Sequence, residues 1–294
     1  MSKLRDQMID YMTVKGYSVK TIKSYTTCIG CFSKFYKKSP LFITTEEIFA
    51  FLLKLRRENK SDATLGLYFE SLKFFYTLHG MRARMPNISI RRKPRSLPVI
   101  LSRTEVFNLL ENCGSLKLKT ILSVMYASGL RISEIVNLKL KDVDFCRRVI
   151  FIRKSKGKKD RYTILANTTA ALLKEYMNLY RPRDYLFFRS KDISLPVSES
   201  YIQMNFKKLI RKLGIRKEVH VHTLRHCFAT HLLEHGTNLF YIMRLLGHSS
   251  IHTTMIYLHV QTVDFDKIVS PIDMSMPPMV LDAAARDDLF SRSA

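Results

Sequence analysis

The stretch covering residues 222–257 constrains the fold most, because its apolar residues follow a helical spacing that two glycines interrupt. Apolar residues recur at helical spacing before Gly236, and a second apolar run over residues 239–246 stops at Gly247. Glycine adopts the left-handed conformation that commonly ends an α-helix. The stretch therefore predicts two consecutive amphipathic helices, each ended by a glycine.

Polar residues that can act on a phosphate occupy fixed positions around these helices. His222 and Arg225 lie three positions apart, which predicts that they share one face of the first helix. His248 follows the glycine that ends the second helix, and Tyr257 is predicted on a third, short helix. The residues predicted to cap this third helix are Ser249, Ser250, Thr253 and Thr254. An arginine and two histidines can hold a phosphate while a phenol attacks it, although each of these residue types alone is more often a packing or surface residue.

The order and spacing of these residues resemble those of a known family. The pattern reads H-x-x-R, then L-L-G-H-S-S, then a tyrosine nine positions after His248. It resembles the C-terminal boxes of the tyrosine recombinase family, which includes phage integrases and Xer-like proteins. The resemblance implies a site-specific DNA recombinase or integrase that cuts and rejoins DNA through a 3′-phosphotyrosyl intermediate, without metal or ATP. It also implies that Tyr257 is the nucleophile and that His222, Arg225 and His248 are catalytic.

A further arginine box lies upstream. The segment A-S-G-L-R-I-S-E follows an apolar run that Gly129 ends, and it puts Arg131 at the start of a helix. Glu134 lies three positions later on the same face, where it can orient that arginine. Taken alone, this pair reads as a surface ion pair. The resemblance implies instead that Arg131 is catalytic and that Glu134 supports it, because A-S-G-L-R-x-S-E matches the first arginine box of the family.

A basic hairpin is predicted between the two boxes. Strand-like runs at residues 149–152 and 161–165 flank a lysine-rich turn that contains a glycine. A flexible lysine at such a tip can reach a minor groove and protonate a leaving oxygen. The resemblance implies that this lysine is Lys156, which precedes the glycine of K-G-x-K-x-R. The rival lysines of the same loop, each of which alone reads as a phosphate contact, are Lys154, Lys158 and Lys159.

The predicted chemistry needs a base, an acid and stabilisation of charge. A phenol with a pKa of about 10 is only ~0.1% ionised at neutral pH, so Tyr257 needs a proton acceptor. His222 is the predicted base, and Lys156 is the predicted acid for the departing 5′-hydroxyl. The residues predicted to bind the non-bridging phosphate oxygens are Arg131, Arg225 and His248. No cluster of carboxylates suggests a catalytic metal, so we expect no cofactor.

The charge balance indicates a polyanionic partner. The 294 residues include 49 lysines and arginines against 25 acidic residues, a formal net charge of +24. In a chain that is 46% hydrophobic, this excess favours nucleic acid, here double-stranded DNA, over the competing membrane surface. No stretch approaches eighteen consecutive apolar residues and the N-terminus lacks a signal-peptide core, so we expect a soluble, cytoplasmic, nucleoid-associated protein. Five cysteines, an odd number, favour reduced thiols.

The predicted fold class is mainly α, with a small β-hairpin or sheet in the C-terminal part. Residues 1–84 contain four runs with helical spacing, and they resemble the N-terminal core-binding, SAM-like helical domain of the family. Residues 85–98 are predicted to be a basic linker, because prolines and charges replace the helical spacing. Residues 99–294 are predicted to form the catalytic domain, with a C-terminal tail from about residue 265 to residue 294.

Two basic segments are candidates for contacts with the DNA backbone. The linker contributes the first segment, and a helix predicted over residues 198–214 contributes the second. Their basic residues are Arg91, Arg92, Lys93, Arg95, Lys207, Lys208, Arg211 and Lys212. For each of these side chains, a solvated position without DNA contact is the alternative.

The number of active sites per chain predicts self-association. Exchange of two duplexes requires four strand cuts and one chain offers one Tyr257, so we expect a tetramer on two DNA sites. Val280–Phe290 is the segment predicted to dock on a neighbouring protomer, because its sparse apolar residues cannot form a core of their own. A frayed tail is the alternative.

Two other functions stay open from the sequence. The segment H-L-L-E-H, with His231, Glu234 and His235, matches a zinc-protease pattern in which two histidines bind zinc and the glutamate acts as base. A basic DNA-binding accessory protein without chemistry is the second alternative, although all six predicted catalytic positions are filled in this chain.

Overall fold

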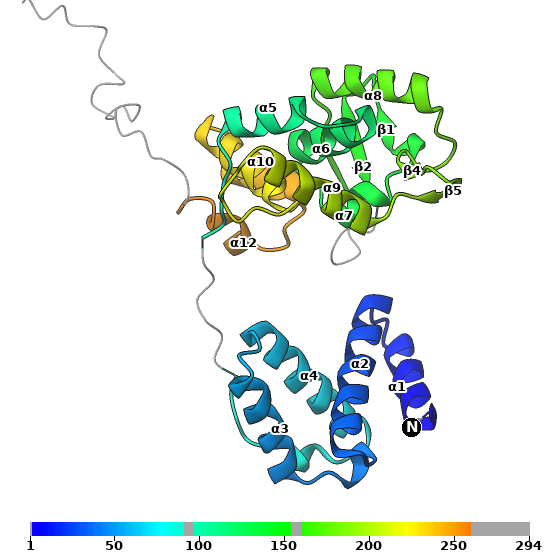
Figure 1. The fold of residues 1–294 in the computed structure, drawn as a ribbon, viewed down its shortest axis with the longest axis vertical. Coiled ribbons are helices and arrows are strands. Elements are labelled where there is room, and N and C mark those ends of the chain that lie inside the picture. Colours follow the sequence, from blue (N-terminus) through cyan, green and yellow to red (C-terminus); the bar gives the residue numbers. More distant parts are fainter. Residues whose placement is uncertain (1, 91–96, 154–159, 260–294) are drawn as a thin grey trace, which may run out of the picture. The chain divides into compact units, whose positions relative to one another are not determined.

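The structure is a computed structural model that describes residues 2–90, 97–153 and 160–259. The contacts within the chain divide it into two compact units, Met1–Ser96 and Leu97–Ala294. Each unit has its own hydrophobic core and is mainly helical, and the strands of the described residues belong to the second unit (Figure 1).

The first unit is built from four helices whose starts the sequence specifies locally. The helices are α1 (Ser2–Val14), α2 (Val19–Tyr36), α3 (Thr45–Arg57) and α4 (Asp62–Leu78), with 3₁₀ turns at Pro40–Phe42 and Arg82–Arg84. Thr44 precedes α3 in a capping box with Glu47, and the Ser61 hydroxyl caps α4. The four helices expected in this part of the chain are therefore present.

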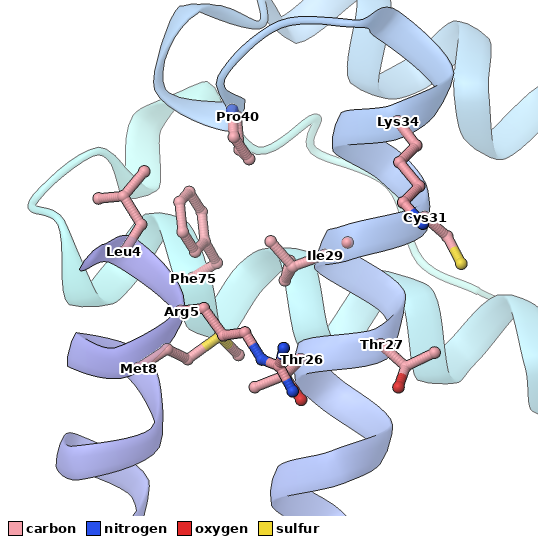
Figure 2. A pocket seen from close by; sticks show the side chains of 11 residues that line it. Leu4, Arg5, Met8, Thr26, Thr27, Ile29, Cys31, Lys34, Pro40 and Phe75 are labelled. Carbon is pink, nitrogen blue, oxygen red and sulfur yellow. The ribbon is translucent and has the colours of Figure 1, made fainter. Parts of the chain in front are cut away.

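The core of the first unit is aromatic and apolar. Phe32, Phe51 and Phe75 are buried, and the rings of Phe32 and Phe51 meet edge to face with their centroids 4.9 Å apart. A pocket with a volume of about 480 Å³ opens beside this core, and residues of α1 and α2, among them Met8 and Ile29, line much of it (Figure 2). The lining is mainly apolar, so the pocket is an extension of the hydrophobic core toward the surface.

The second unit combines helices with two small antiparallel sheets, ordered β1-β2-β3 and β4-β5. Its helices are α5 (Arg103–Glu111), α6 (Leu116–Ser128), α7 (Ile132–Val136), α8 (Asn167–Tyr180), α9 (Glu199–Lys212), α10 (Thr223–Glu234), α11 (Leu239–Leu246) and α12 (His252–Met255), with a 3₁₀ turn at Leu140–Asp142. Its strands are β1 (Val143–Asp144), β2 (Val149–Ile152), β3 (Arg161–Ile164), β4 (Phe188–Arg189) and β5 (Asp192–Pro196). Within the described ranges, no helix is both long enough and apolar enough to cross a membrane.

Helix α6 is the central element of the second unit. Nine of its 13 residues are buried, and α8 and α10 both pack against it. Gly129 ends the helix in the left-handed conformation, with φ of 63°. A Cβ atom at Gly129 would lie 2.4 Å from Cδ1 of Phe228, so this helix end requires glycine for space as well as for conformation.

Strands β2 and β3 form the predicted hairpin. Val149 pairs with Ile164, and Ile152 pairs with Arg161. Burial alternates along β3, and Arg161 faces the interior. The turn between the strands, which carries the predicted acid Lys156, lies outside the described residues.

The predicted fold class is confirmed, with local differences. The structure adds β1 and β5, two short strands without a clear alternation of apolar residues. Residues 185–188 are a short apolar run typical of a strand, but Tyr185 makes only an isolated bridge with Lys139 and β4 starts at Phe188. The hydrogen bonds of these segments come from the chain segments beside them, so local propensity does not determine their extent.

The end of the described chain also differs from expectation. Tyr257 lies two residues beyond α12 rather than on it, and the N-cap residue of α12, Ile251, makes no side-chain cap. The predicted hydroxyl caps are therefore wrong. One of these hydroxyls, that of Thr254, instead lies 2.9 Å from Nδ1 of His248, because Thr254 is buried.

Candidate active site

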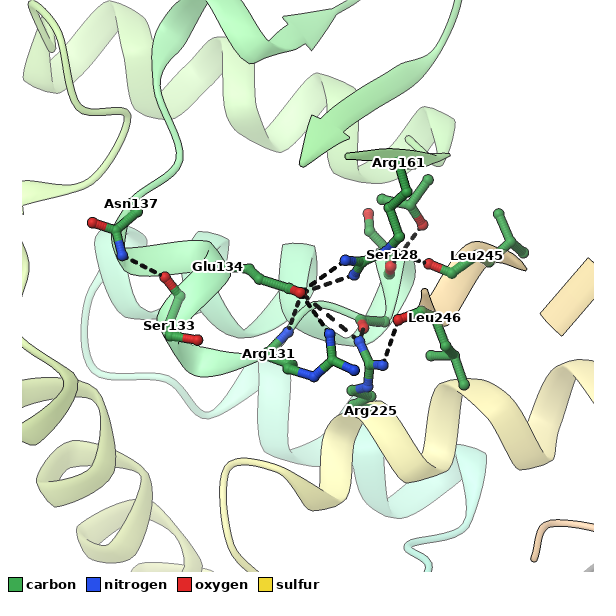
Figure 3. Close-up of polar contacts among 11 residues, drawn as sticks. Ser128, Arg131, Ser133, Glu134, Asn137, Arg161, Arg225, Leu245 and Leu246 are labelled. Carbon is green, nitrogen blue, oxygen red and sulfur yellow. Dashed lines mark hydrogen bonds and ion pairs between the residues drawn. The ribbon is translucent and has the colours of Figure 1, made fainter. Parts of the chain in front are cut away.

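The carboxylate of Glu134 lies at the centre of the site. Glu134 belongs to α7, which starts directly after Arg131. The backbone N–H of Arg131 donates to Oε2 of Glu134 at 2.8 Å, and Nη1 of Arg131 donates to Oε1 at 2.7 Å (Figure 3). The Glu134 side chain is 6% exposed and that of Arg131 is 18% exposed. This pair is therefore a buried interaction and not the surface ion pair that the two residues alone would suggest.

A second arginine reaches the same carboxylate. Nη1 and Nη2 of Arg161 donate to the two oxygens of Glu134, each at 2.8 Å. This bidentate arrangement matches the planar fork of the guanidinium to the carboxylate. Nε of Arg161 donates to the carbonyl oxygen of Leu245, at the end of α11, at 2.8 Å. Arg161 therefore ties β3, α7 and α11 together.

Arg225, on α10, is the third arginine and is 1% exposed. Its Nη1 donates to the carbonyl of Gly129 at 2.7 Å, and its Nη2 donates to the carbonyl of Leu246 at 2.6 Å (Figure 3). These carbonyls lie at the C-terminal ends of α6 and α11, where the helix dipole favours a cation. Burial and the charge of Arg131 lower the pKa of Arg225 to about 9, so Arg225 is still charged at neutral pH.

The three arginines around Glu134, here called the arginine group (Arg131, Arg161 and Arg225), carry excess positive charge. Burial alone would raise the pKa of Glu134, but the hydrogen bonds and charges of Arg161 and Arg131 lower it to about 2. The carboxylate is therefore ionised at neutral pH. Three guanidinium groups and one carboxylate leave a net charge of +2 in a largely buried volume, which favours an anion such as a phosphodiester.

Gly247 sets the direction in which the chain leaves α11. Its φ is 65°, and a Cβ atom there would lie 2.7 Å from Cδ of Arg161, so glycine is required for conformation and for space. His248 follows directly, and its Nδ1 contacts the hydroxyl of Thr254. Burial, followed by the charges of the arginine group, lowers the pKa of His248 to about 3. The ring is therefore neutral at pH 7.

Tyr257 is 2% exposed and belongs to an apolar cluster with Phe228. Its hydroxyl oxygen lies 3.0 Å from Nδ1 of His226. Burial raises the pKa of Tyr257, whereas the charges of Arg225 and Arg131 act in the opposite direction. The phenol is therefore protonated at neutral pH, and it lies within the electrostatic influence of the arginine group.

Two histidines, His222 and His226, are the remaining titratable groups beside Tyr257. His222 occupies the N-cap position of α10 and is the more exposed of the two, and His226 lies one turn later. Their rings meet edge to face, with centroids 4.8 Å apart. Burial lowers the pKa of both rings, and for His226 the charges of His222 and Arg225 add to this effect and bring its pKa to about 4.

The structure brings six of the predicted site residues close enough together that their charges affect the pKa values within the group. These residues are Arg131, Glu134, His222, Arg225, His248 and Tyr257. The predicted residues outside the described part of the chain are Lys154, Lys156, Lys158, Lys159, Arg91, Arg92, Lys93 and Arg95. The four basic residues of the helix predicted over residues 198–214, Lys207, Lys208, Arg211 and Lys212, lie on α9 and are exposed.

Arg161, His226 and Thr254 are site contacts that sequence reasoning missed. Arg161 is the arginine of K-G-x-K-x-R, and His226 directly follows the arginine of H-x-x-R. Their partners, however, are 27 and 31 positions away along the chain. A position in or next to a motif was the available signal, and sequence spacing did not identify the partner.

The zinc-protease alternative does not agree with the geometry of α10. Nδ1 of His231 lies 2.9 Å from the hydroxyl of Tyr126, and its Nε2 lies 3.0 Å from the carbonyl oxygen of Leu101. A zinc ligand needs a ring nitrogen with a free lone pair, and both nitrogens of His231 are engaged in hydrogen bonds. Within residues 2–90, 97–153 and 160–259, no group of three or more His, Cys, Asp or Glu side chains is arranged to hold a metal ion.

Similarity to known proteins covers both units. Residues 100–263 match the phage integrase family, and residues 4–79 match the N-terminal SAM-like domain of phage integrases. The first match spans more than half of the chain, so the chain belongs to the phage integrase family. Within that family it is a tyrosine site-specific recombinase, as its named relatives are.

The relatives match nearly the whole length of the chain. Tyrosine recombinase XerA of Pyrococcus horikoshii is 33% identical over 265 residues, covering 89% of this chain and 90% of the relative. Tyrosine recombinase XerD of Listeria innocua is 33% identical over 285 residues, covering 88% of this chain and 95% of the relative. A crystal structure of XerA recombinase is 32% identical with a TM-score of 0.52, covering 90% of this chain and 94% of that one. The λ integrase dimer bound to a core site has the same fold at 18% identity, with a TM-score of 0.72, and covers 92% of this chain and 99% of that one.

Proposed function

We propose that this recombinase cuts and rejoins double-stranded DNA through a covalent 3′-phosphotyrosyl intermediate at Tyr257. The observation that carries the proposal is the position of the Tyr257 hydroxyl beside a neutral histidine and within the influence of Arg225 and Arg131. This arrangement combines a nucleophile with positive charge and hydrogen-bond donors for a phosphate. Exchange of a phosphodiester for a phosphotyrosyl ester conserves bond energy, so religation needs no ATP.

The arginine group supplies the charge that a phosphorane-like transition state requires. Arg131 and Arg225 bind the non-bridging oxygens of the scissile phosphate, and His248 donates a further hydrogen bond. Glu134, which Arg161 holds at 2.8 Å, fixes Arg131 through a contact of 2.7 Å. The carbonyls of Gly129 and Leu246 fix Arg225, and the hydroxyl of Thr254 contacts His248. Because the geometry is already formed, little reorganisation accompanies the reaction.

Two proton transfers complete the proposed reaction. The Tyr257 hydroxyl loses a proton as it attacks the phosphorus atom, and the departing 5′-oxygen gains one. His222 is the base that the sequence favours. The acid is Lys156, supported by its motif alone, and the rivals in the same loop are Lys154, Lys158 and Lys159.

Double-stranded DNA is the proposed partner. The net charge of +24 and the exposed basic residues of α9 support it. XerH, a recombinase of similar fold, has been solved bound to its difH substrate, and λ integrase has been solved bound to a core site. We assign residues 1–84 to a DNA-gripping domain, residues 85–98 to a basic linker and residues 99–294 to the catalytic domain, acting at the nucleoid of a bacterial cytoplasm.

Assembly into a tetramer on two DNA sites is part of the proposal. One chain supplies one Tyr257, and two duplexes require four cuts. The segment Val280–Phe290, which lies outside the described residues, is the proposed element that docks on a neighbouring protomer.

Covalent capture tests the proposed function. The probe is a nicked duplex selected from a random-sequence library by its SDS-stable attachment to the wild-type protein. Tyr257→Phe should abolish this attachment and leave the affinity for the duplex close to that of the wild-type protein, because only the nucleophilic oxygen is lost. A covalent complex formed by the Phe variant would contradict the assignment of the nucleophile.

The assignment of the acid has a separate test. Lys156→Ala should slow cleavage of the ordinary phosphodiester, by roughly 10²-fold or more, and should largely spare a duplex whose bridging 5′-oxygen is replaced by sulfur, because a thiolate leaves without protonation. Lys154→Ala is the matched control in the same loop. If Lys154→Ala shows the sulfur rescue instead, the acid is Lys154.

A further inference from the structure

The Tyr257 hydroxyl contacts a histidine to which neither the motif nor the chemistry above assigns a role. Its oxygen lies 3.0 Å from Nδ1 of His226, and the two ring centroids are 5.7 Å apart. Within the described residues, this is the hydrogen bond that the Tyr257 side chain makes. We infer that Nδ1 of His226 is the direct acceptor of the Tyr257 proton, which makes His226 a catalytic residue of the proposed recombination reaction, on which this inference rests.

The position of His222 differs from that of His226. His222 lies at the N-cap of α10, in the more exposed position, and it makes no hydrogen bond to Tyr257 among the described contacts. The ring of His226 contacts both neighbours, with centroids 4.8 Å from His222 and 5.7 Å from Tyr257. A general base must lie within about 2.6–3.2 Å of the group that it deprotonates. His226 meets this condition in the structure, whereas the ring of His222 contacts that of His226.

The surroundings of His226 leave Nδ1 able to accept a proton. The groups that face its ring are His222 and Arg225 on α10, His248 after α11, and Tyr257 after α12. Burial, His222 and Arg225 hold the pKa of His226 at about 4, so the ring is neutral at pH 7. A neutral imidazole with its proton on Nε2 offers Nδ1 as acceptor to the phenol O–H.

Binding of the substrate would strengthen this base. A ring with a pKa of about 4 is a weak base in the free protein. A phosphodiester anion held by Arg131 and Arg225 would offset part of the positive charge that lowers the pKa of His226. Burial still lowers the pKa of His226 in the complex, but the base is stronger with DNA bound than in the free protein, where Tyr257 stays protonated.

The proposed step balances without a further reactant. The O–H bond of Tyr257 breaks as the proton moves to Nδ1 of His226, and the phenolic oxygen forms a bond to phosphorus. The bond from phosphorus to the 5′-oxygen breaks, and this oxygen takes a proton from the acid, Lys156 in the proposed mechanism. In religation the 5′-hydroxyl returns its proton to the neutral lysine as its oxygen attacks phosphorus. The bond from phosphorus to the Tyr257 oxygen breaks, and the His226 imidazolium returns its proton to that oxygen.

The variant His226→Asn separates proton transfer from positioning. In His226→Asn an amide oxygen can accept the hydrogen bond of Tyr257 but cannot take the proton. Formation of the covalent complex with the selected nicked duplex should therefore slow by roughly 10²–10⁴-fold, while affinity for the duplex is retained. His222→Asn is the matched control on the same helix, and it should slow the reaction less because it leaves the contact between His226 and Tyr257 intact.

A more acidic nucleophile gives a second measurement that a merely structural role would not affect. 3,5-Difluorotyrosine in place of Tyr257 ionises more readily and needs less help from a base. It should restore most of the rate lost in His226→Asn, and it should not restore the rate lost in His248→Asn, because His248 is proposed to bind the phosphate. If His226→Asn no longer binds the duplex, His226→Gln provides a second variant for the same comparison.

The outcomes separate this inference from the function on which it rests. If the wild-type protein captures no duplex from the library, both the proposed function and the role of His226 fail. If the wild-type protein reacts and a DNA-binding His226→Asn variant reacts at a similar rate, the role of His226 fails while the function stands. A slow variant that difluorotyrosine does not rescue would make His226 a positioning residue and would also overturn the inference.

Discussion

Two basic regions of the second unit use positive charge in opposite ways. The arginine group surrounds Glu134 and is largely removed from solvent, with the Arg161 side chain 7% exposed and that of Arg225 1% exposed. The α9 row is exposed along one helix and consists of Lys207, Lys208, Arg211 and Lys212. The first region holds its charges in one geometry, whereas the second presents them to water.

Hydration explains the difference. A buried cation loses its hydration shell, so it needs a carboxylate or the C-terminal end of a helix to compensate. The charges of the arginine group therefore depend on one another through Glu134. Exposed lysines keep their water, and their contributions should add. The buried arginine group should therefore be sensitive to a single substitution, whereas the exposed α9 row should not.

Removal of Glu134 should have the largest effect and tests this interdependence. Glu134→Ala leaves three arginines without their shared carboxylate, so the free energy of unfolding should fall by about 3–5 kcal/mol. Urea unfolding of the full chain measures it. The control is Glu111→Ala, which removes the 70%-exposed partner of Lys119 and should cost less than about 1 kcal/mol. Similar losses of stability in the two variants would show that the buried arginines depend on Glu134 no more than Lys119 depends on Glu111.

The low pKa values of the histidines beside the arginine group predict that stability depends on pH. This effect should be smaller than that of Glu134→Ala. In the folded chain the pKa is about 4 for His226 and about 3 for His248, whereas an unfolded histidine titrates near pH 6.5. Between these values the unfolded chain binds more protons, so stability is full above about pH 6.5 and decreases as the pH falls toward 4.

After a discount for solvent screening, the free energy of unfolding should decrease by about 1 kcal/mol for each of these two histidines between pH 7.5 and pH 5. Thermal unfolding at the two pH values measures this decrease. His248→Asn should make the decrease smaller, and the exposed control His252→Asn should not change it. A decrease that is the same in both variants would mean that the histidine beside the arginine group does not titrate differently on folding.

Single substitutions in the α9 row should have the smallest effect on stability, in contrast to substitutions in the arginine group. Lys207→Ala should lower the slope of log affinity against log salt by about 1 if Lys207 contacts a phosphate, with stability unchanged within about 0.5 kcal/mol. Further substitutions in the row should add to this change. Lys191→Ala, exposed at the turn between β4 and β5, is the control and should leave the slope unchanged. A loss of stability in the α9 variants would show that this row is not the solvated counterpart of the arginine group.

The sequence by itself determined the helices, most of their ends and the order of the motifs. Ser102 and Glu105, at the S-x-x-E spacing, form a capping box at α5. Gly129 and Gly247 end α6 and α11 as predicted. These features depend on interactions between residues within about one helical turn, which a reader of the sequence can evaluate directly. The motifs then indicated the family and, through it, the fold class.

Only the tertiary structure decided which side chains meet at the carboxylate of Glu134 and at the hydroxyl of Tyr257. Arg161 reaches Glu134 across 27 positions, and His226 reaches Tyr257 across 31 positions. Such contacts depend on how β3, α10 and α12 are placed by the surrounding helices, and no local pattern encodes them. The same packing removes Glu134 from water and so converts an apparent surface ion pair into the centre of a buried network. Helix formation is local, whereas desolvation, which determines pKa values and the strength of ion pairs, is a property of the whole unit.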